Sequence, residues 1–100
     1  MFKTIADVKK ANKAIKNHWF NKETMDFFGT KIESELIDGK YFITSEDDFY
    51  RTKRQYRLRI VEKNGKIYTP GDGRPFDSLD DAKKELKKYR VKIKLKPLNK

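Results

Sequence analysis

The stretch from Trp19 to Val61 constrains the fold most, because it carries nine of the thirteen aromatic residues in a chain of 100. These rings are Trp19, Phe20, Phe27, Phe28, Tyr41, Phe42, Phe49, Tyr50 and Tyr56. Each buried ring removes roughly 150 to 250 Å² from water. Since only 36% of the residues are hydrophobic, this stretch has to supply much of the core. The flanking segments are therefore expected to cover it.

The length and composition indicate one small domain. A chain of 100 residues has the usual size of a single domain, so residues 1–100 are assigned to one. No cysteine is present, which excludes disulfides and thiolate zinc sites. The N-terminus leads directly into a charged amphipathic segment, and no apolar run reaches the roughly 18 residues of a membrane helix. A cytoplasmic protein without membrane contact is expected.

Two helical segments are predicted in the N-terminal third. Apolar residues at helical spacing predict a first helix over residues 5–17, with Thr4 as its N-cap. Asn21 can cap a short aromatic helical turn that runs through Phe28 and stops at Gly29. One face of the first helix is rich in lysine. Such a face is typical of solvated surface helices, and phosphate contact is its weaker interpretation. That face consists of Lys9, Lys10, Lys13 and Lys16.

Several of these segments resemble a known family. Residues 11–20, the run Thr24-Met25-Asp26-Phe27-Phe28-Gly29-Thr30, and residues 41–46 are similar to a widespread family of small uncharacterised proteins encoded by phages and other mobile elements. The likeness continues through Tyr56-Arg57 and a final helix over 79–89, so it covers most of the chain. It implies a genomic setting and brings no known activity.

From Thr30 to Thr69 the apolar period changes to two, which predicts four antiparallel strands. Asp38-Gly39 and Asn64-Gly65 are turn sequences that join these strands into two hairpins. The polar, acidic segment 45–53 is expected to be a loop between the hairpins. The strands are expected around residues 32–36, 41–45, 56–60 and 66–69.

If the apolar sides of these strands face the helices, four charged residues stand on the open face of the sheet. They are Glu33, Glu35, Arg57 and Arg59. Opposite charges on neighbouring strands stabilise a sheet by roughly 0.2 to 1 kcal/mol per pair. This arrangement favours a surface charge lattice for the two arginines over a phosphate site, and both interpretations stay open.

The C-terminal third is predicted to add a helix. Residues 70–75 form a connector of turn residues, and Asp77 or Ser78 can cap the helix that follows. Its buried stripe consists of Leu79, Ala82, Leu86 and Tyr89. Apolar residues then alternate with lysines over 91–96, and residues 91–100 form either a basic terminal edge strand or a flexible tail.

The predicted fold class is α+β. An N-terminal helix, a short aromatic helical turn, a four-stranded antiparallel meander and a C-terminal helix follow in order, with the helices on one face of the sheet. The predicted core is Ile5, Val8, Ile15, Phe20, Met25, Phe28, Ile32, Leu36, Tyr41, Ile43, Tyr56, Leu58, Ile60, Ile67, Leu79, Ala82 and Leu86.

The charge is strongly basic and unevenly spread. The net charge is +10 at pH 7, and residues 83–100 alone carry nine basic side chains and one acidic one. Residues 21–50 carry eight acidic and three basic side chains. Their acidic excess can neutralise part of the basic charge of residues 51–68. A basic surface suits a polyanion partner. The candidate nucleic-acid-binding residues are Lys83, Lys84, Lys87, Lys88, Arg90, Lys92, Lys94, Arg57 and Arg59.

Catalysis has little support in the sequence. His18 is the only histidine, and no carboxylate or cysteine lies at a metal-binding spacing from it. The adjacent carboxylates Asp47-Asp48 and Asp80-Asp81 fall in a polar loop and at a helix start, where the helix dipole explains the second pair. No enzyme activity, metal or cofactor is expected.

A binding function is therefore predicted. The first hypothesis is a basic module that contacts nucleic acid or a nucleoprotein complex. The alternative, suggested by the resemblance to phage-encoded proteins, is an anti-defence inhibitor of anti-CRISPR or anti-restriction type, which would contact a host nuclease by protein–protein interaction.

Overall fold

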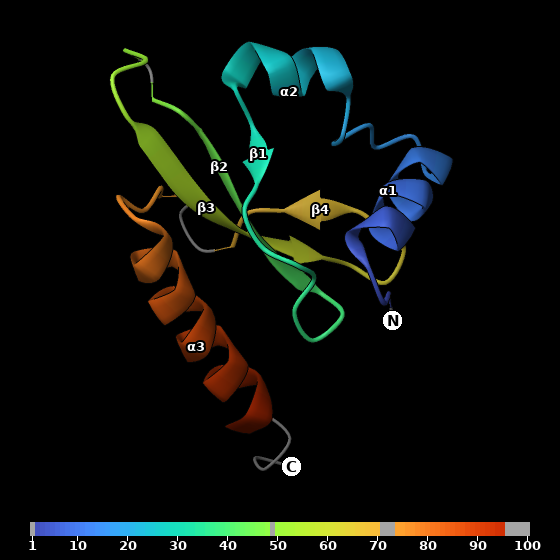
Figure 1. Ribbon diagram of the computed structural model, residues 1–100. Helices are drawn as coiled ribbons and strands as arrows, with labels where there is room; N and C mark the ends of the chain where they lie inside the picture. Colours follow the sequence, from blue (N-terminus) through green and yellow to red (C-terminus); the bar gives the residue numbers. More distant parts are fainter. Residues whose placement is uncertain (1, 49, 71–73, 96–100) are drawn as a thin grey trace.

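The computed structural model describes residues 2–48, 50–70 and 74–95, and of residues 90–95 it describes the backbone. The chain forms an α+β domain with helices at both ends of an antiparallel sheet (Figure 1). Its elements are α1 (Ile5–Ala14), α2 (Lys22–Phe28), β1 (Lys31–Ile32), β2 (Tyr41–Asp47), β3 (Arg54–Val61), β4 (Ile67–Tyr68) and α3 (Leu79–Leu95). The predicted fold class is confirmed.

The sheet is a meander with strand order β1-β2-β3-β4. Its main part is the β2–β3 ladder, which runs from the Tyr41–Ile60 pair to the Asp47–Arg54 pair. β1 is shorter than predicted, since it ends at Ile32. Beyond it the Oγ of Ser34 accepts a hydrogen bond from the backbone nitrogen of Ile43 at 2.9 Å, in place of a ladder bond. A side-chain acceptor thus ends the pairing of the first strand.

Both predicted hairpin turns are confirmed. Asp38 and Gly39 have φ values of 54° and 71°, as a tight turn between right-twisted strands requires. At the second turn Gly65 has φ 97°. The backbone nitrogen of Glu62 donates to the carbonyl of Lys66 at 2.8 Å and closes this turn.

The N-terminal helices begin at the predicted caps. Thr4 and Asp7 form a reciprocal capping box at the start of α1. α1 ends at Ala14, earlier than the predicted Asn17, and the chain then takes positive φ values at Lys16 and His18. α2 matches its prediction, since Asn21 caps it and Gly29 ends it in the left-handed conformation.

The two longer helices cover opposite faces of the sheet, which corrects the prediction that they share one face (Figure 1). On one face Ile43 and Leu58 pack against α3; on the other Phe42 and Val61 pack against Val8 of α1. All residues of 41–45 are buried. Successive side chains of a strand point to opposite faces, so this unbroken buried run shows that both faces are covered.

Because helices cover both faces of the sheet, the observed core differs in part from the predicted core. Seven predicted core residues are buried, namely Val8, Tyr41, Ile43, Leu58, Ile67, Ala82 and Leu86. Phe42 and Val61 are also buried, although the one-faced interpretation placed them outside. Ile15 and Phe28 were predicted to be buried, but they are 40% and 46% exposed. Ile15 lies beyond the shortened α1, and Phe28 ends α2, which has no buried residue.

α3 is longer than predicted. Its N-cap is Ser78, one of the two predicted caps. The side chain of Ser78 accepts a hydrogen bond from the backbone nitrogen of Asp81 at 3.1 Å. The helix continues to Leu95, so the predicted edge strand over 91–95 is wrong. No breaker separates Tyr89 from Val91, and extending a helix costs less than starting a new element. The predicted strand or tail over 96–100 lies outside the described residues.

Candidate functional site

The lysines of α3 form an exposed surface. Lys83, Lys84, Lys87 and Lys88 are exposed, while Ala82 and Leu86 of the same helix are buried against the sheet. Residues three and four apart lie on one side of a helix, so these lysines share the side that faces away from the sheet. We call this set the α3 lysine face. Its described contact with an acid joins Lys88 Nζ to Glu85 Oε1 at 3.6 Å.

The structure separates the predicted nucleic-acid-binding residues into two groups. Arg90, Lys92 and Lys94 lie on the continuing backbone of α3, and their side chains lie outside the described part of the chain. Arg57 and Arg59 lie on β3 on the opposite face of the sheet, with Phe42 and Thr44 as their direct neighbours on β2. That face is covered by α1 and by Trp19 and Phe20, so the arginines are not on an open face as predicted.

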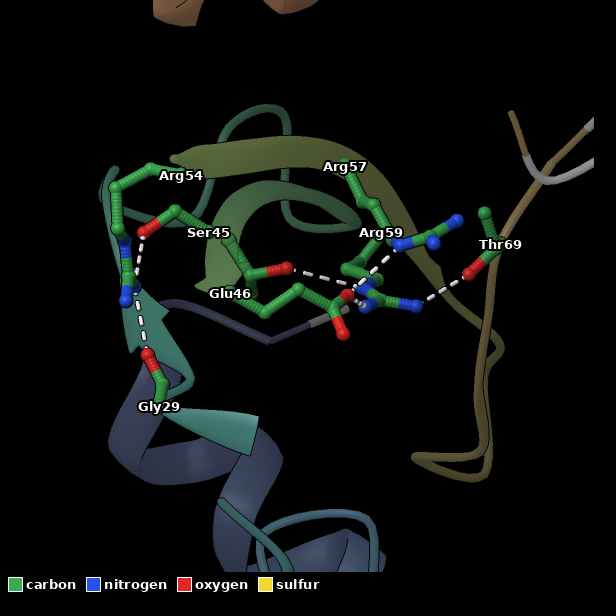
Figure 2. A network of polar contacts seen from close by, with 8 residues as sticks. Gly29, Ser45, Glu46, Arg54, Arg57, Arg59 and Thr69 are labelled. Carbon is green, nitrogen blue, oxygen red and sulfur yellow. Dashed lines mark hydrogen bonds and ion pairs between the residues drawn. The ribbon is translucent and has the colours of Figure 1, made fainter. Parts of the chain in front are cut away.

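The two arginines converge on one carboxylate (Figure 2). The Nε of Arg57 lies 2.7 Å from Glu46 Oε1, and the Nη2 of Arg59 lies 3.4 Å from the same oxygen. The side chains of Arg57, Arg59 and Glu46 are 24%, 13% and 18% exposed. The arginines thus pair with Glu46 and not with the predicted Glu33 or Glu35, and the cluster is largely shielded from water.

Arg59 is held by partners on several elements. Its Nε donates to the hydroxyl of Thr44 at 3.1 Å, and its Nη1 donates to the hydroxyl of Thr69. The guanidinium carbon lies 5.2 Å from the centre of the Trp19 ring, in cation–π contact. Burial is the main cause that lowers the pKa of Arg59, the charge of Glu46 raises it and the charge of Arg57 lowers it, and together they lower the pKa to about 10. Burial thus opposes the charge on Arg59 more than Glu46 supports it.

A cleft of about 390 Å³ opens beside this cluster, between α2 and the sheet. We call it the α2 cleft. Its lining combines cations, one carboxylate, hydroxyls and apolar side chains. The lining residues are His18, Trp19, Thr24, Met25, Phe28, Thr30, Glu46, Arg57 and Arg59.

A second arginine network holds the C-terminal end of α2. Arg54 Nη2 donates to the carbonyl of Gly29 at 2.6 Å and to Ser45 Oγ at 2.7 Å. Its Nη1 lies 2.9 Å from Asp47 Oδ1. Gly29 ends α2, so these bonds tie the end of that helix to the β2–β3 ladder (Figure 2).

The sequence did not reveal the α2 cleft. Glu46 was placed in a loop, whereas it lies in β2, two residues beyond Thr44 and on the same face. Met25 and Phe28 are predicted core residues, although they line the cleft. The usable signal in the sequence is the unbroken apolar run Tyr41-Phe42-Ile43, because it indicates a sheet covered on both faces, which places Arg57 and Arg59 under a cover.

Neither metal binding nor membrane spanning gains support from the described residues. Within residues 2–48, 50–70 and 74–95, no three His, Cys, Asp or Glu side chains are grouped so that they could hold a metal ion. None of the helices described there is long and apolar enough to span a membrane.

Comparison with known proteins gives a family and no function. No curated protein and no solved structure was found to match the chain. The model of a family described as "Family of unknown function (DUF7447)" matches residues 4–87. This match covers every strand, α1, α2 and the first half of α3, including three of the four lysines of the α3 lysine face. The chain therefore belongs to this family of unknown function, DUF7447.

Proposed function

We propose that this protein is a non-catalytic binding module that contacts nucleic acid, alone or in a nucleoprotein complex, through the α3 lysine face. The observation that carries the proposal is the set of exposed cations Lys83, Lys84, Lys87 and Lys88 on one side of one helix. Among the described residues, Lys83, Lys84 and Lys87 take part in no salt bridge, so their charge remains available to phosphates.

The distribution of charge supports α3 over α1 as the contact surface. Residues 83–100 carry a net charge of +8, while residues 1–20 carry +4. α1 and α3 lie on opposite faces of the sheet, so one straight duplex cannot lie along both. Lysine contacts to phosphates release counterions without reading base identity. Binding is therefore expected to tolerate any sequence and to weaken steeply with salt.

A charge-reversal pair tests the proposal. One variant changes Lys83, Lys84 and Lys87 to Glu, and the matched control changes Lys10, Lys13 and Lys16 to Glu. All six lysines are exposed, so both variants lose the same net charge from different faces. Fluorescence anisotropy with labelled duplex and single strands of random sequence is measured from about 50 to 200 mM salt. Exposed substitutions of this kind change stability by only about 0.5 kcal/mol each.

The wild-type protein is expected to lose roughly a hundredfold in affinity across this salt range, scaled down from proteins with more phosphate contacts. The α3 variant is expected to lose binding at low salt, while the α1 variant keeps most of it. Equal loss in both variants would contradict a localised face. Absence of any binding at low salt would overturn the proposal and favour an inhibitor that contacts a host nuclease.

We also propose that the protein is encoded by a phage or another mobile element. This proposal rests on the sequence resemblance of residues 11–20, 24–30 and 41–46.

A further inference from the structure

We propose that a cavity at one end of the β2–β3 ladder binds a small aromatic acid, with its rings against Tyr68 and Tyr89 and its carboxylate at Lys40 and Lys63. The cavity has a volume of about 730 Å³, and we call it the ladder-end cavity. None of the four lysines of the α3 lysine face is among its described lining residues. The inference therefore goes beyond the proposed function and can be tested separately.

The ladder-end cavity is built where distant segments of the chain meet. The backbone nitrogen of Val61 donates to the carbonyl of Lys40 at 2.8 Å, just beyond the last pair of the ladder. Tyr41 and Val61 are 1% and 5% exposed, so they form the floor of the cavity. Phe2 packs with the core on the α1 face of the sheet, and Tyr89 packs with the core on the α3 face. The cavity thus spans the end of the sheet from one face to the other.

The walls favour a flat aromatic ligand. Four of the lining side chains are aromatic, namely Phe2, Tyr41, Tyr68 and Tyr89. Tyr68 is 42% exposed, which places it at the mouth. Aromatic rings that stack or meet edge to face attract one another beyond the effect of the area that they bury. The volume also lies within the roughly 300 to 1,000 Å³ of small-ligand sites, which are mostly apolar with a few polar groups.

The charges around the cavity favour a ligand with one negative charge. Its lining includes the ammonium groups of Lys40 and Lys63 and the carboxylate of Glu62, so two positive charges and one negative charge leave a net charge of +1. In the described part of the chain, neither ammonium group takes part in a salt bridge. The Nζ of Lys40 lies 5.5 Å from the centre of the Tyr41 ring, which places its charge over the floor.

These two features together select the class of ligand. A carboxylate carries one negative charge and balances the net charge of the lining, whereas a phosphate monoester carries about 1.5 to 2. A neutral aromatic compound would leave both ammonium groups without an anion. An aliphatic acid would leave the exposed ring of Tyr68 without an aromatic partner. A small aromatic acid uses both features of the cavity.

Amide chemical shifts locate the binding of three probes. Wild-type protein is titrated with naphthalene-2-carboxylate, naphthalene-2-carboxamide or cyclohexanecarboxylate, each at constant ionic strength. The first probe has both the rings and the charge, and each of the others lacks one of them. Saturable shifts with naphthalene-2-carboxylate are expected at the amides of residues 39–41, 60–63 and 68. At least about fivefold weaker binding is expected for each of the other two probes.

A fourth probe distinguishes a free acid from the end of a peptide, because a peptide that ends in an aromatic residue presents the same two groups. A tetrapeptide that ends in phenylalanine is therefore titrated as well. If the site takes free acids, the peptide binds at least about tenfold more weakly than naphthalene-2-carboxylate. If the site takes peptide ends, the peptide binds at least as tightly.

A pair of double variants tests the role of the two lysines. One changes Lys40 and Lys63 to Gln, and the matched control changes Lys10 and Lys13 to Gln, at exposed positions of α1. The first variant is expected to lose the preference for the carboxylate over the carboxamide while its affinity for the carboxamide stays unchanged. The control variant, which loses the same net charge, is expected to keep the preference.

Tyr68→Ala tests the role of the rings. It is expected to weaken binding of naphthalene-2-carboxylate and of naphthalene-2-carboxamide several-fold, and by similar factors, because it removes a wall and leaves the charges in place. Circular dichroism checks that each variant is folded. Where Tyr68→Ala unfolds, the lysine variants and the comparison of probes on wild-type protein decide the question.

The proposal is overturned by any of three results. The first is the absence of saturable shifts up to about 10 mM naphthalene-2-carboxylate, well above a millimolar dissociation constant. The second is equal affinity of wild-type protein for the carboxylate and the carboxamide. The third is that the largest shifts fall at residues of the α2 cleft. None of these results bears on the α3 lysine face, because that face is assayed with different probes and different variants.

Discussion

Asn12 donates a hydrogen bond from Nδ2 to the backbone carbonyl of Gly65 at 2.9 Å, across 53 positions of the sequence. The Asn12 side chain also accepts a hydrogen bond from the backbone nitrogen of Trp19 at 2.9 Å. It is 1% exposed. One buried amide thus joins α1, the β3–β4 turn and the segment that leads into the α2 cleft.

Asn12→Ala is expected to destabilise the protein by about 2 to 3 kcal/mol, because it leaves buried backbone groups of Gly65 and Trp19 without their partner. Chemical denaturation measures the free energy of unfolding. Asn17→Ala serves as the control, since Asn17 is exposed and its side chain shares one hydrogen bond with Asn12, at 2.8 Å. A loss of about 1 kcal/mol or less is expected there. Equal losses in the two variants would contradict the role given to the buried amide.

Gly65→Ala is expected to cost about 3 kcal/mol or more in stability. The φ of Gly65 is +97°, and a Cβ at this position would lie 2.7 Å from Cβ of Ala11 and 2.9 Å from the backbone nitrogen of Asn12. The backbone of α1 cannot move away without losing its packing on the sheet.

Gly29→Ala is the comparison for this prediction. Its φ is +64°, and the added Cβ would meet the carboxylate of Asp47 at 2.5 Å. A side chain can rotate away, so the expected cost is about 1 to 2 kcal/mol, mainly from the left-handed backbone. Thermal unfolding of both variants gives the order, and a larger loss for Gly29→Ala would contradict it.

The ends of α2 and the two hairpin turns could be predicted from the sequence because each depends on residues that are neighbours in the chain. Asn21 and Gly29 bound α2, and Asp38-Gly39 and Asn64-Gly65 turn the hairpins, as chain chemistry alone requires. The side of the sheet on which a helix packs is decided by distant contacts. The packing of Val8 against Phe42 and Val61 could not be read from the spacing within either segment.

Replacing Phe42 or Leu58 by Ala tests whether both faces of the sheet are buried. Phe42 is 0% exposed and Leu58 is 2% exposed, and they belong to different core clusters. Losses of about 3 to 5 kcal/mol for Phe42→Ala and 2 to 5 kcal/mol for Leu58→Ala are expected. Ile15→Ala, at an exposed position, is the control with an expected loss under about 1 kcal/mol. A similarly small loss for Phe42→Ala would mean that one face is open.

The candidate sites differ in how far the sequence could predict them. Lys83, Lys84, Lys87 and Lys88 could be placed on a surface from helical periodicity alone, since Ala82 and Leu86 mark the buried side. The α2 cleft depends on Arg59 meeting Glu46, Thr69 and Trp19, which lie on separate segments. No single window of sequence contains that arrangement, and only the folded sheet brings it together.

Glu46→Gln tests the balance of charge at the cleft. Glu46 is the carboxylate that Arg57 and Arg59 share, so its loss removes a counter-charge from two largely shielded guanidinium groups. Removing one partner from a fully buried ion pair costs roughly 3 to 5 kcal/mol. With Glu46 18% exposed, we expect about 1 to 3 kcal/mol. Glu35→Gln, at an exposed position, is the matched control and should lie within about 0.5 kcal/mol of wild type.

The same variant separates a structural arginine cluster from an anion site. If the cleft accepts phosphate, the Glu46→Gln protein should bind it more tightly than wild type, because the competing carboxylate is gone. Its melting temperature should then rise more in phosphate than in chloride at equal ionic strength, and by more than that of wild-type protein. Equal melting temperatures in the two salts would show that the arginines serve only to join β2, β3 and the Trp19 segment. Adding Arg57→Gln to Glu46→Gln should abolish the phosphate effect, because the accessible guanidinium is then removed as well.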